Sequence, residues 1–239
     1  MDTPQTMEPA RVLAQRYCDL VGATYALVEP YMIASYLAGV VEHAESAVKD
    51  IASVALNYRN QLRLAVADVY QKRSTPVGLQ DAMGALIETF APRVFAEGMQ
   101  EGGADPDEME DEEREALQAW VDNQLTYVPA FTEAVDNAET DQAQESILNR
   151  LDLWSGALRN LGDMGKAFAL KNRTGQWRLG GTIEHCSTCT RLSNGRPRRV
   201  SWYIHNGYIP RQVGSETLEC KGFQCLCGVY DPKTDERLL

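Results

Sequence analysis

The chain has 239 residues and a mass of 26.6 kDa, and 44% of its residues are hydrophobic and 24% charged. These proportions, with a mean hydropathy of -0.35, are typical of a globular protein and argue against a disordered, collagen-like or disulfide-dense chain. The formal net charge of -11 would repel the molecule as a whole from bare nucleic acid and from an anionic membrane. No uninterrupted apolar run reaches about 18 residues, so we expect no membrane span, and the acidic first residues predict no export signal.

Charge and cysteine are divided unevenly along the chain. Residues 1–170 carry 12 basic against 28 acidic side chains, whereas residues 171–239 carry 11 against 6. Five of the six cysteines fall after residue 185, and the sixth is Cys18. Five clustered thiols and one distant thiol favour a metal site in a reducing compartment over the disulfide framework of a secreted protein.

From residue 9 to about residue 172 the sequence predicts one helix after another. The longest is expected from Pro30 to about Lys72, with apolar residues three and four apart. At about 43 residues it would be roughly 65 Å long, so it must find partners, and we expect an elongated helical bundle. Further helices are predicted over 76–100, with a kink at Pro92, and over 108–126, 129–138 and 140–172. In the last helix six apolar residues share one face: Ile147, Leu151, Trp154, Leu158, Leu161 and Phe168.

Three features of the helical region have an ordinary structural explanation. Residues 101–115 hold nine acidic side chains and one Arg, which predicts a solvated loop that leads into an acidic helix start. Cys18 and His43 lie in helical sequence and are expected to be packing or surface residues rather than ligands. The segment 162–167 superficially resembles a phosphate loop, but its glycines are too close together and it lacks Ser or Thr, so a helix is expected.

The composition changes at Thr174, where Gly-rich sequence and short strand-like runs begin. The pairs Asn194-Gly195 and Asn206-Gly207 between these runs are strong hairpin signals. We therefore predict two domains: an α-helical domain over 1–173, and over 174–239 a small β-rich, cysteine-rich module with a C-terminal tail.

The cysteines of this module have the spacing of a metal site. Cys186-Ser-Thr-Cys189 is a knuckle that can present two thiolates to one ion, and a second group, Cys220, Cys225 and Cys227, follows after 30 residues. This pattern predicts structural zinc, which would replace the core that so short a module lacks. Cys186 and Cys189 are the firm ligands. Cys220 and Cys225 are preferred for the second pair, on the expectation that Cys225 and Cys227 would not easily face one ion together, and Cys227 remains a substitute.

Other uses of these thiols stay open. Cys220 could form a disulfide with Cys225 or Cys227, and Cys186 with Cys189 could serve a thiol-based redox enzyme. A nucleophilic pair of His185 with a neighbouring thiol is less favoured, because adjacent residues in a knuckle rarely have that geometry. A catalytic zinc needs an open position and a nearby base, and no clear base accompanies these cysteines, so we predict a structural site and no enzyme.

Arginines and aromatic residues are interleaved after the first cysteine pair. Such a pattern can bind a nucleic-acid backbone, and packaged DNA could be contacted through Arg196, Arg198 and Arg199. The alternative is that the aromatic side chains fill a small core while the arginines are solvated or pair with the protein's own acidic face. His205 is expected at the surface. The residues concerned are Arg191, Arg196, Arg198, Arg199, Arg211, Trp177, Trp202, Tyr203 and Tyr208.

About 55 residues of the module resemble the end of a family of tailed-bacteriophage minor head proteins, the head morphogenesis proteins similar to the F protein of phage Mu. In that family the second cysteine group commonly reads His-Pro-x-Cys-Arg-Cys, whereas this chain has no His there, so individual ligands do not transfer directly. The residues that carry the resemblance are Trp177, Glu184 to Cys189, Gly195, Trp202, Gly207, Pro210, Leu218 to Cys220, and Cys225 to Cys227.

The resemblance implies a structural virion protein, assembled in the host cytoplasm and associated with the portal vertex or capsid interior, that acts in head assembly or genome delivery. Its expected partners are other virion proteins, such as portal, capsid or connector, within a homo-oligomeric or symmetric assembly. Two alternatives stay open: a connector, neck or capsid-associated protein, and a cytoplasmic zinc-dependent nucleic-acid-binding protein.

Overall fold

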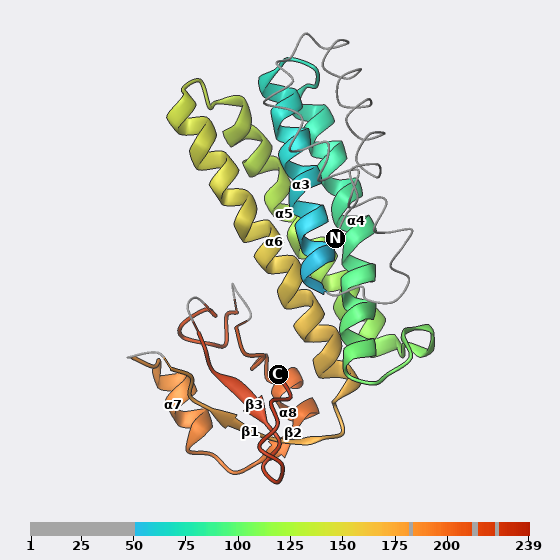
Figure 1. The fold of residues 1–239 in the computed structure, drawn as a ribbon, viewed down its shortest axis with the longest axis vertical. Helices are drawn as coiled ribbons and strands as arrows, with labels where there is room; N and C mark the ends of the chain where they lie inside the picture. Colours follow the sequence, from blue (N-terminus) through green and yellow to red (C-terminus); the bar gives the residue numbers. More distant parts are fainter. Residues whose placement is uncertain (1–50, 182–183, 212–214, 223–224) are drawn as a thin grey trace, which may run out of the picture. The chain divides into compact units, whose positions relative to one another are not determined.

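The structure is a computed structural model that describes residues 51–181, 184–211, 215–222 and 225–239. This part of the chain is mainly helical, with a small sheet near the C-terminus (Figure 1). A cluster of cysteines also lies near the C-terminus. Four long helices come first: α3 (Ile51–Tyr70), α4 (Pro76–Glu101), α5 (Asp111–Asp136) and α6 (Asp141–Ala169). Short elements follow: β1 (Thr174–Arg178), α7 (Ser187–Ser193), β2 (Arg198–Arg199), α8 (Val200–His205) and β3 (Gly228–Tyr230). The first part of the predicted helix 30–72, with Cys18 and His43, lies outside the described residues.

The long helices begin where local side chains satisfy their first N–H groups. The hydroxyl of Thr75 accepts a hydrogen bond from the Gly78 N–H at 3.1 Å, and Pro76 occupies the first helical position of α4. Thr140 caps α6 in the same way, through the Ala143 N–H at 3.2 Å. The predicted starts of these two helices are therefore confirmed to within one residue.

The four long helices share one hydrophobic core. The apolar face predicted for α6 is confirmed, because all six of its residues are buried. Val54, Tyr58 and Leu62 of α3 are buried in the same core. Burial of an aliphatic or aromatic side chain is worth about 1.5–3 kcal/mol, so the shared core is the main source of stability for this part of the chain. Within the described residues, no helix is long and apolar enough to cross a membrane.

The two helices predicted over 108–126 and 129–138 are one continuous helix, α5, with Pro129 inside it. The prediction of a break at this proline was wrong. Proline removes one hydrogen-bond donor and crowds the carbonyl four residues before it, but here Val128 and Phe131 on either side of it are buried in the core. Packing of these side chains holds the helix together across the proline.

Helices α4 and α6 cross at very short range because glycines meet there. A Cβ built on Gly98 of α4 would overlap the backbone oxygen of Gly162 in α6 and would lie 3.0 Å from the Lys166 nitrogen. A Cβ on Gly165 would likewise overlap the backbone of Phe95. The glycines of segment 162–167 therefore serve helix packing, and the predicted helix at this segment is confirmed.

The small sheet has the strand order β2-β1-β3, and β1 pairs antiparallel with both neighbours. Trp177 of β1 is 1% exposed and packs against Tyr203 of α8 with ring centroids 6.0 Å apart. The two Asn-Gly pairs do not form the predicted hairpins. Asn194 ends α7 and Asn206 ends α8, because the Asn-Gly sequence, which favours a hairpin turn, also suits the end of a helix.

Residues 50–239 form one compact unit, and the sheet is tied to the long helices within it. The Val200 N–H donates to the Arg173 carbonyl at 2.9 Å. The ammonium of Lys171, which follows α6, lies 2.6 Å from Glu110 and 3.0 Å from Glu113 at the start of α5. These ion pairs raise the pKa of Lys171, chiefly through the hydrogen bond to Glu110, although desolvation opposes the shift.

Candidate metal centre

The first pair of cysteines lies at the start of α7. Cys186 is the N-cap residue, and its Sγ accepts a hydrogen bond from the Cys189 N–H at 3.4 Å. The Thr190 hydroxyl donates to the Cys186 carbonyl at 3.1 Å, which fixes the same turn. Backbone N–H groups directed at sulfur favour its thiolate form, the form that binds metal.

The second group begins in a tight turn at Cys220. Lys221 and Gly222 both have positive φ, at 50° and 74°, and the Lys221 N–H donates to the Leu218 carbonyl at 2.7 Å. The Gly222 N–H acts to lower the pKa of the Cys220 thiol, against the larger effect of burial. Glycine adopts positive φ without strain, so the sequence Cys-Lys-Gly suits this turn.

The two groups meet around Cys189. The sulfurs of Cys186, Cys189 and Cys220 lie within 4.8 Å of one another, and so do those of Cys189, Cys225 and Cys227. Four sulfurs at about 2.3 Å from one tetrahedral ion would be roughly 3.8 Å apart, so each group of three has a spacing close to that of three such ligands. A fourth sulfur would have to move closer from the other group, because no four of the described sulfurs lie within 4.8 Å of one another. All five cysteines predicted from the sequence are thus brought together, and each of them is a free thiol.

Cys225 and Cys227 both face Cys189, contrary to the expectation that the two would not easily face one ion. Both are buried, and both sulfurs lie within 4.8 Å of Cys189. The expectation was wrong in its geometry, because side chains two residues apart in an extended segment lie on the same face.

The crowding of thiols perturbs their ionisation. Burial raises the pKa of Cys189, and the neighbouring sulfurs raise it further. Burial also raises the pKa of Cys220, with a contribution from Cys186, although the Gly222 N–H opposes it. Burial acts against ionisation of Cys186 as well, but hydrogen bonds from Cys189 and Cys220 outweigh it, so that the pKa of Cys186 is lowered. A divalent cation would relieve this mutual repulsion and allow several thiolates to form together.

Contacts from outside the cysteines hold the two groups in place. Glu219 accepts hydrogen bonds from the N–H of Ser187 at 2.9 Å and from its hydroxyl at 2.5 Å, so the residue before Cys220 caps the helix that follows Cys186. A Cβ built on Gly180 would overlap the carbonyl of Leu226, between the last two cysteines. Sequence reasoning missed both residues. The Gly180-Gly181 pair was a visible signal of close backbone approach, whereas no sequence signal pointed to Glu219.

The donor atoms of this centre are sulfurs. His185 is near, with its Nδ1 3.9 Å from the Cys227 Sγ, but the two groups that could hold an ion contain cysteine alone within the described residues. Thiolate ligands select soft or borderline ions such as Zn²⁺ or the iron of iron–sulfur clusters, and they disfavour Mg²⁺ and Ca²⁺. The arrangement is that of a site able to hold a metal ion.

Some arginines of the tail form ion pairs with acidic residues, and others have no acidic partner among the described residues. Arg173 pairs with Asp231 at 2.9 Å and Arg211 with Asp163 at 3.4 Å. Arg196 and Arg199 are exposed, and the described residues offer neither of them an acidic partner. His205 is exposed as expected.

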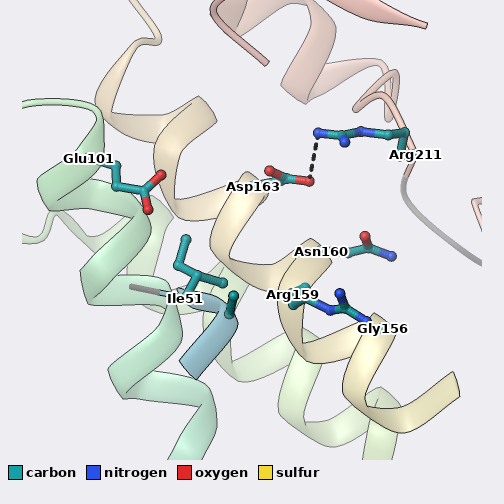
Figure 2. A pocket seen from close by; sticks show the side chains of 8 residues that line it. Ile51, Glu101, Gly156, Arg159, Asn160, Asp163 and Arg211 are labelled. Carbon is teal, nitrogen blue, oxygen red and sulfur yellow. Dashed lines mark hydrogen bonds and ion pairs between the residues drawn. The ribbon is translucent and has the colours of Figure 1, made fainter. Parts of the chain in front are cut away.

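A hollow of about 610 Å³ adjoins the Asp163 ion pair (Figure 2). Figure 2 shows Arg211 directed toward Asp163, with Asn160 and Arg159 of the same helix beside them. Burial raises the pKa of Asp163, while Arg211 and other basic groups oppose the shift. The pair joins Arg211, six residues after the end of α8, to α6, so this hollow is explained by the packing of the protein.

No protein-family model matches the chain, and neither a curated protein nor a solved structure matches it. What the protein does is therefore inferred from its own residues and their surroundings.

Proposed function

We propose that the protein is a structural component of a tailed-phage particle, a minor head or portal-associated protein. In this proposal an elongated helical bundle over 1–173 is followed by a module over 174–239 that a structural zinc ion holds together. The observation that carries it is the meeting of two cysteine groups, more than 30 residues apart in sequence, around Cys189.

Zinc suits these ligands better than other common ions. It binds four thiolates in a tetrahedron, has no redox chemistry, and is the usual ion for paired cysteine groups. Cys186 and Cys189 would bind it together with two of Cys220, Cys225 and Cys227. A structural zinc contributes about 10–16 kcal/mol to the folding of isolated finger peptides, which would offset the small core of this tail.

A structural role is favoured over a catalytic one by the surroundings of the sulfurs. Catalytic zinc commonly has three protein ligands, an open position and a nearby base. Here five thiols compete for four positions, and three of them are buried. Such a site would be filled by protein ligands, with no position left for a substrate.

The virion role rests on the resemblance of the module to the tails of phage minor head proteins. A head protein that binds its neighbours also needs exposed apolar surface, and Tyr127 of α5 and Leu153 of α6 are more than half exposed. We therefore expect portal, capsid or connector proteins as partners, in a symmetric assembly formed in the host cytoplasm. A connector, neck or capsid-associated protein would fit the same features.

Metal analysis of anaerobically purified protein tests the zinc site. We expect about one zinc per chain, and Cys189→Ser should abolish zinc binding and unfold the tail while the helical circular dichroism is largely kept. Cys18→Ser, which changes a cysteine far from the group in sequence, is the matched control and should retain zinc. Protein that contains no zinc, or Cys189→Ser protein that still binds it, would contradict the proposal.

Mass spectrometry of purified particles tests the virion role separately. We expect the protein in particles, with crosslinks from the long helices to a portal, capsid or connector protein. Its absence from particles, together with a normal zinc content, would overturn the virion role and leave the zinc site standing. That result would favour a cytoplasmic zinc-dependent protein.

A further inference from the structure

A second hollow lies beside the sheet, apart from the cysteine residues. It has a volume of about 580 Å³, within the usual range for a ligand site. Its lining is basic, with one large aromatic side chain and one proline: Arg196, Pro197, Arg198, Arg199, Ser201, Trp202 and His205.

Two of the three arginines carry uncompensated charge. Arg196 and Arg199 are exposed and have no acidic partner among the described residues. Some other arginines of the tail do have one, as in the pair of Arg178 with Asp235. Three basic side chains without an acidic partner among the described residues thus line this one hollow, although the whole chain is acidic.

The third arginine is oriented by an aromatic ring and is not neutralised. The guanidinium of Arg198 lies over the Trp202 ring, 4.5 Å from its centroid. Trp202 packs edge-on against Tyr203, with centroids 5.2 Å apart, and Tyr203 is buried. The backbone of Arg198 pairs with Gly175 in the sheet. A cation held by a π face keeps its charge and its N–H donors available to an anion.

Within the described part of the chain, the acidic side chain that forms an ion pair with the lining of the hollow is Glu112 of α5. Its carboxylate lies 3.1 Å from the His205 Nε2, at the edge of the hollow. Even with His205 neutral, three guanidinium groups stand against one carboxylate. The hollow therefore keeps a net positive charge.

We infer that this hollow binds the phosphodiester backbone of a nucleic acid. Guanidinium groups bind phosphate through paired N–H donors, and Trp202 and Pro197 offer apolar surface for the adjoining sugar. An acidic peptide would use the arginines alone and would leave that surface without a partner. The inference depends neither on the zinc ion nor on the virion role, because it rests on a different group of residues.

Binding of the full-length protein to a fluorescein-labelled 20-bp duplex DNA tests it, by anisotropy at 50 and 200 mM NaCl. Three phosphate contacts predict a log–log salt slope of about -2.7, so that affinity falls roughly 40-fold between the two concentrations. Arg196→Glu removes one contact, which costs roughly 15-fold at 50 mM salt and reduces the slope to about -1.8. Arg196→Lys keeps the charge and should retain most of the affinity.

Lys233→Glu is the matched control, because Lys233 is exposed in the same tail and the substitution changes the net charge equally. It should bind DNA like the wild type. Zinc content and circular dichroism should be unchanged in all three variants. Three results would each overturn the inference: no DNA binding at 50 mM salt, equal losses for Arg196→Glu and Lys233→Glu, or displacement of the DNA by polyglutamate at the same charge concentration.

Discussion

A methyl group added at Gly180 should weaken metal binding without touching a cysteine. The Cβ of Gly180→Ala would overlap the Leu226 carbonyl group and lie 2.5 Å from the Leu226 Cβ. Ordinary contact between carbon atoms is about 3.5–4.0 Å, so residue 226 would have to move by about 1 Å or more. Residue 226 lies between Cys225 and Cys227, which both belong to the cysteine cluster.

The size of the effect follows from this displacement. Metal–sulfur distances tolerate only about 0.2 Å, so the protein must either strain its backbone or lose a ligand. Overpacking of this kind costs about 1–3 kcal/mol. If that strain falls on the metal-bound state, zinc affinity drops by about 5- to 150-fold, since each 1.4 kcal/mol is a factor of ten.

Competition with a chromophoric zinc chelator measures this change. Gly181→Ala is the control, because a Cβ at Gly181 meets no described atom within 4 Å, and it should bind zinc like the wild type. If Gly180→Ala binds zinc as tightly as Gly181→Ala does, the close approach of Gly180 to residue 226 does not position the ligands, and the reasoning is refuted.

Two further predictions concern stability and ionisation. Gly98→Ala should lower the free energy of unfolding by about 2 kcal/mol, since overpacking at the α4–α6 crossing exceeds the gain of about 1 kcal/mol in helix propensity. Gly84→Ala, whose Cβ would lie 3.8 Å from Leu125, should be neutral or stabilising. Thermal unfolding compares the two variants. The Arg173 guanidinium lowers the pKa of Asp231 to about 2, so its stabilising contribution is complete above about pH 3.8 and is lost as the pH falls toward 2. Carboxyl NMR should show Asp231 still ionised at pH 4 in the wild type. In the Arg173→Gln protein, the Asp231 carboxyl should begin to titrate at that pH. Equal unfolding temperatures for the two glycine variants, or Asp231 titration unaffected by Arg173→Gln, would contradict these predictions.

The sequence predicted the parts of the fold that depend on repeated pattern. The apolar spacing of α6 is continuous over 22 residues, and every residue on that face is buried. The break predicted at Pro129 failed because a single proline is a local signal, whereas the helix is held by core contacts of residues distant in sequence. The hairpins failed for a related reason, since Asn-Gly suits both a hairpin turn and a helix end, and only the surrounding packing decides between them.

The candidate site was predicted in composition but not in geometry. The spacing of the cysteines was enough to expect that they would meet. The geometry expected for Cys225 and Cys227 was wrong, because residues two apart in an extended segment share a face, and both sulfurs lie within 4.8 Å of Cys189. The spacing of the cysteines also could not show that Glu219 contacts the start of α7, because this contact spans 32 residues and no sequence pattern identifies the partner of a carboxylate.

Because Cys189 belongs to both sulfur groups, its loss should affect the tail more than the loss of any other clustered cysteine. Loss of Cys186, Cys220, Cys225 or Cys227 removes one sulfur from one group of three and leaves the other group complete. Loss or oxidation of the shared sulfur affects both groups at once. The turn at residue 220 would keep its hydrogen bonds from Ser187 to Glu219, whereas the segment before β3 would depend mainly on a three-stranded sheet of very short strands.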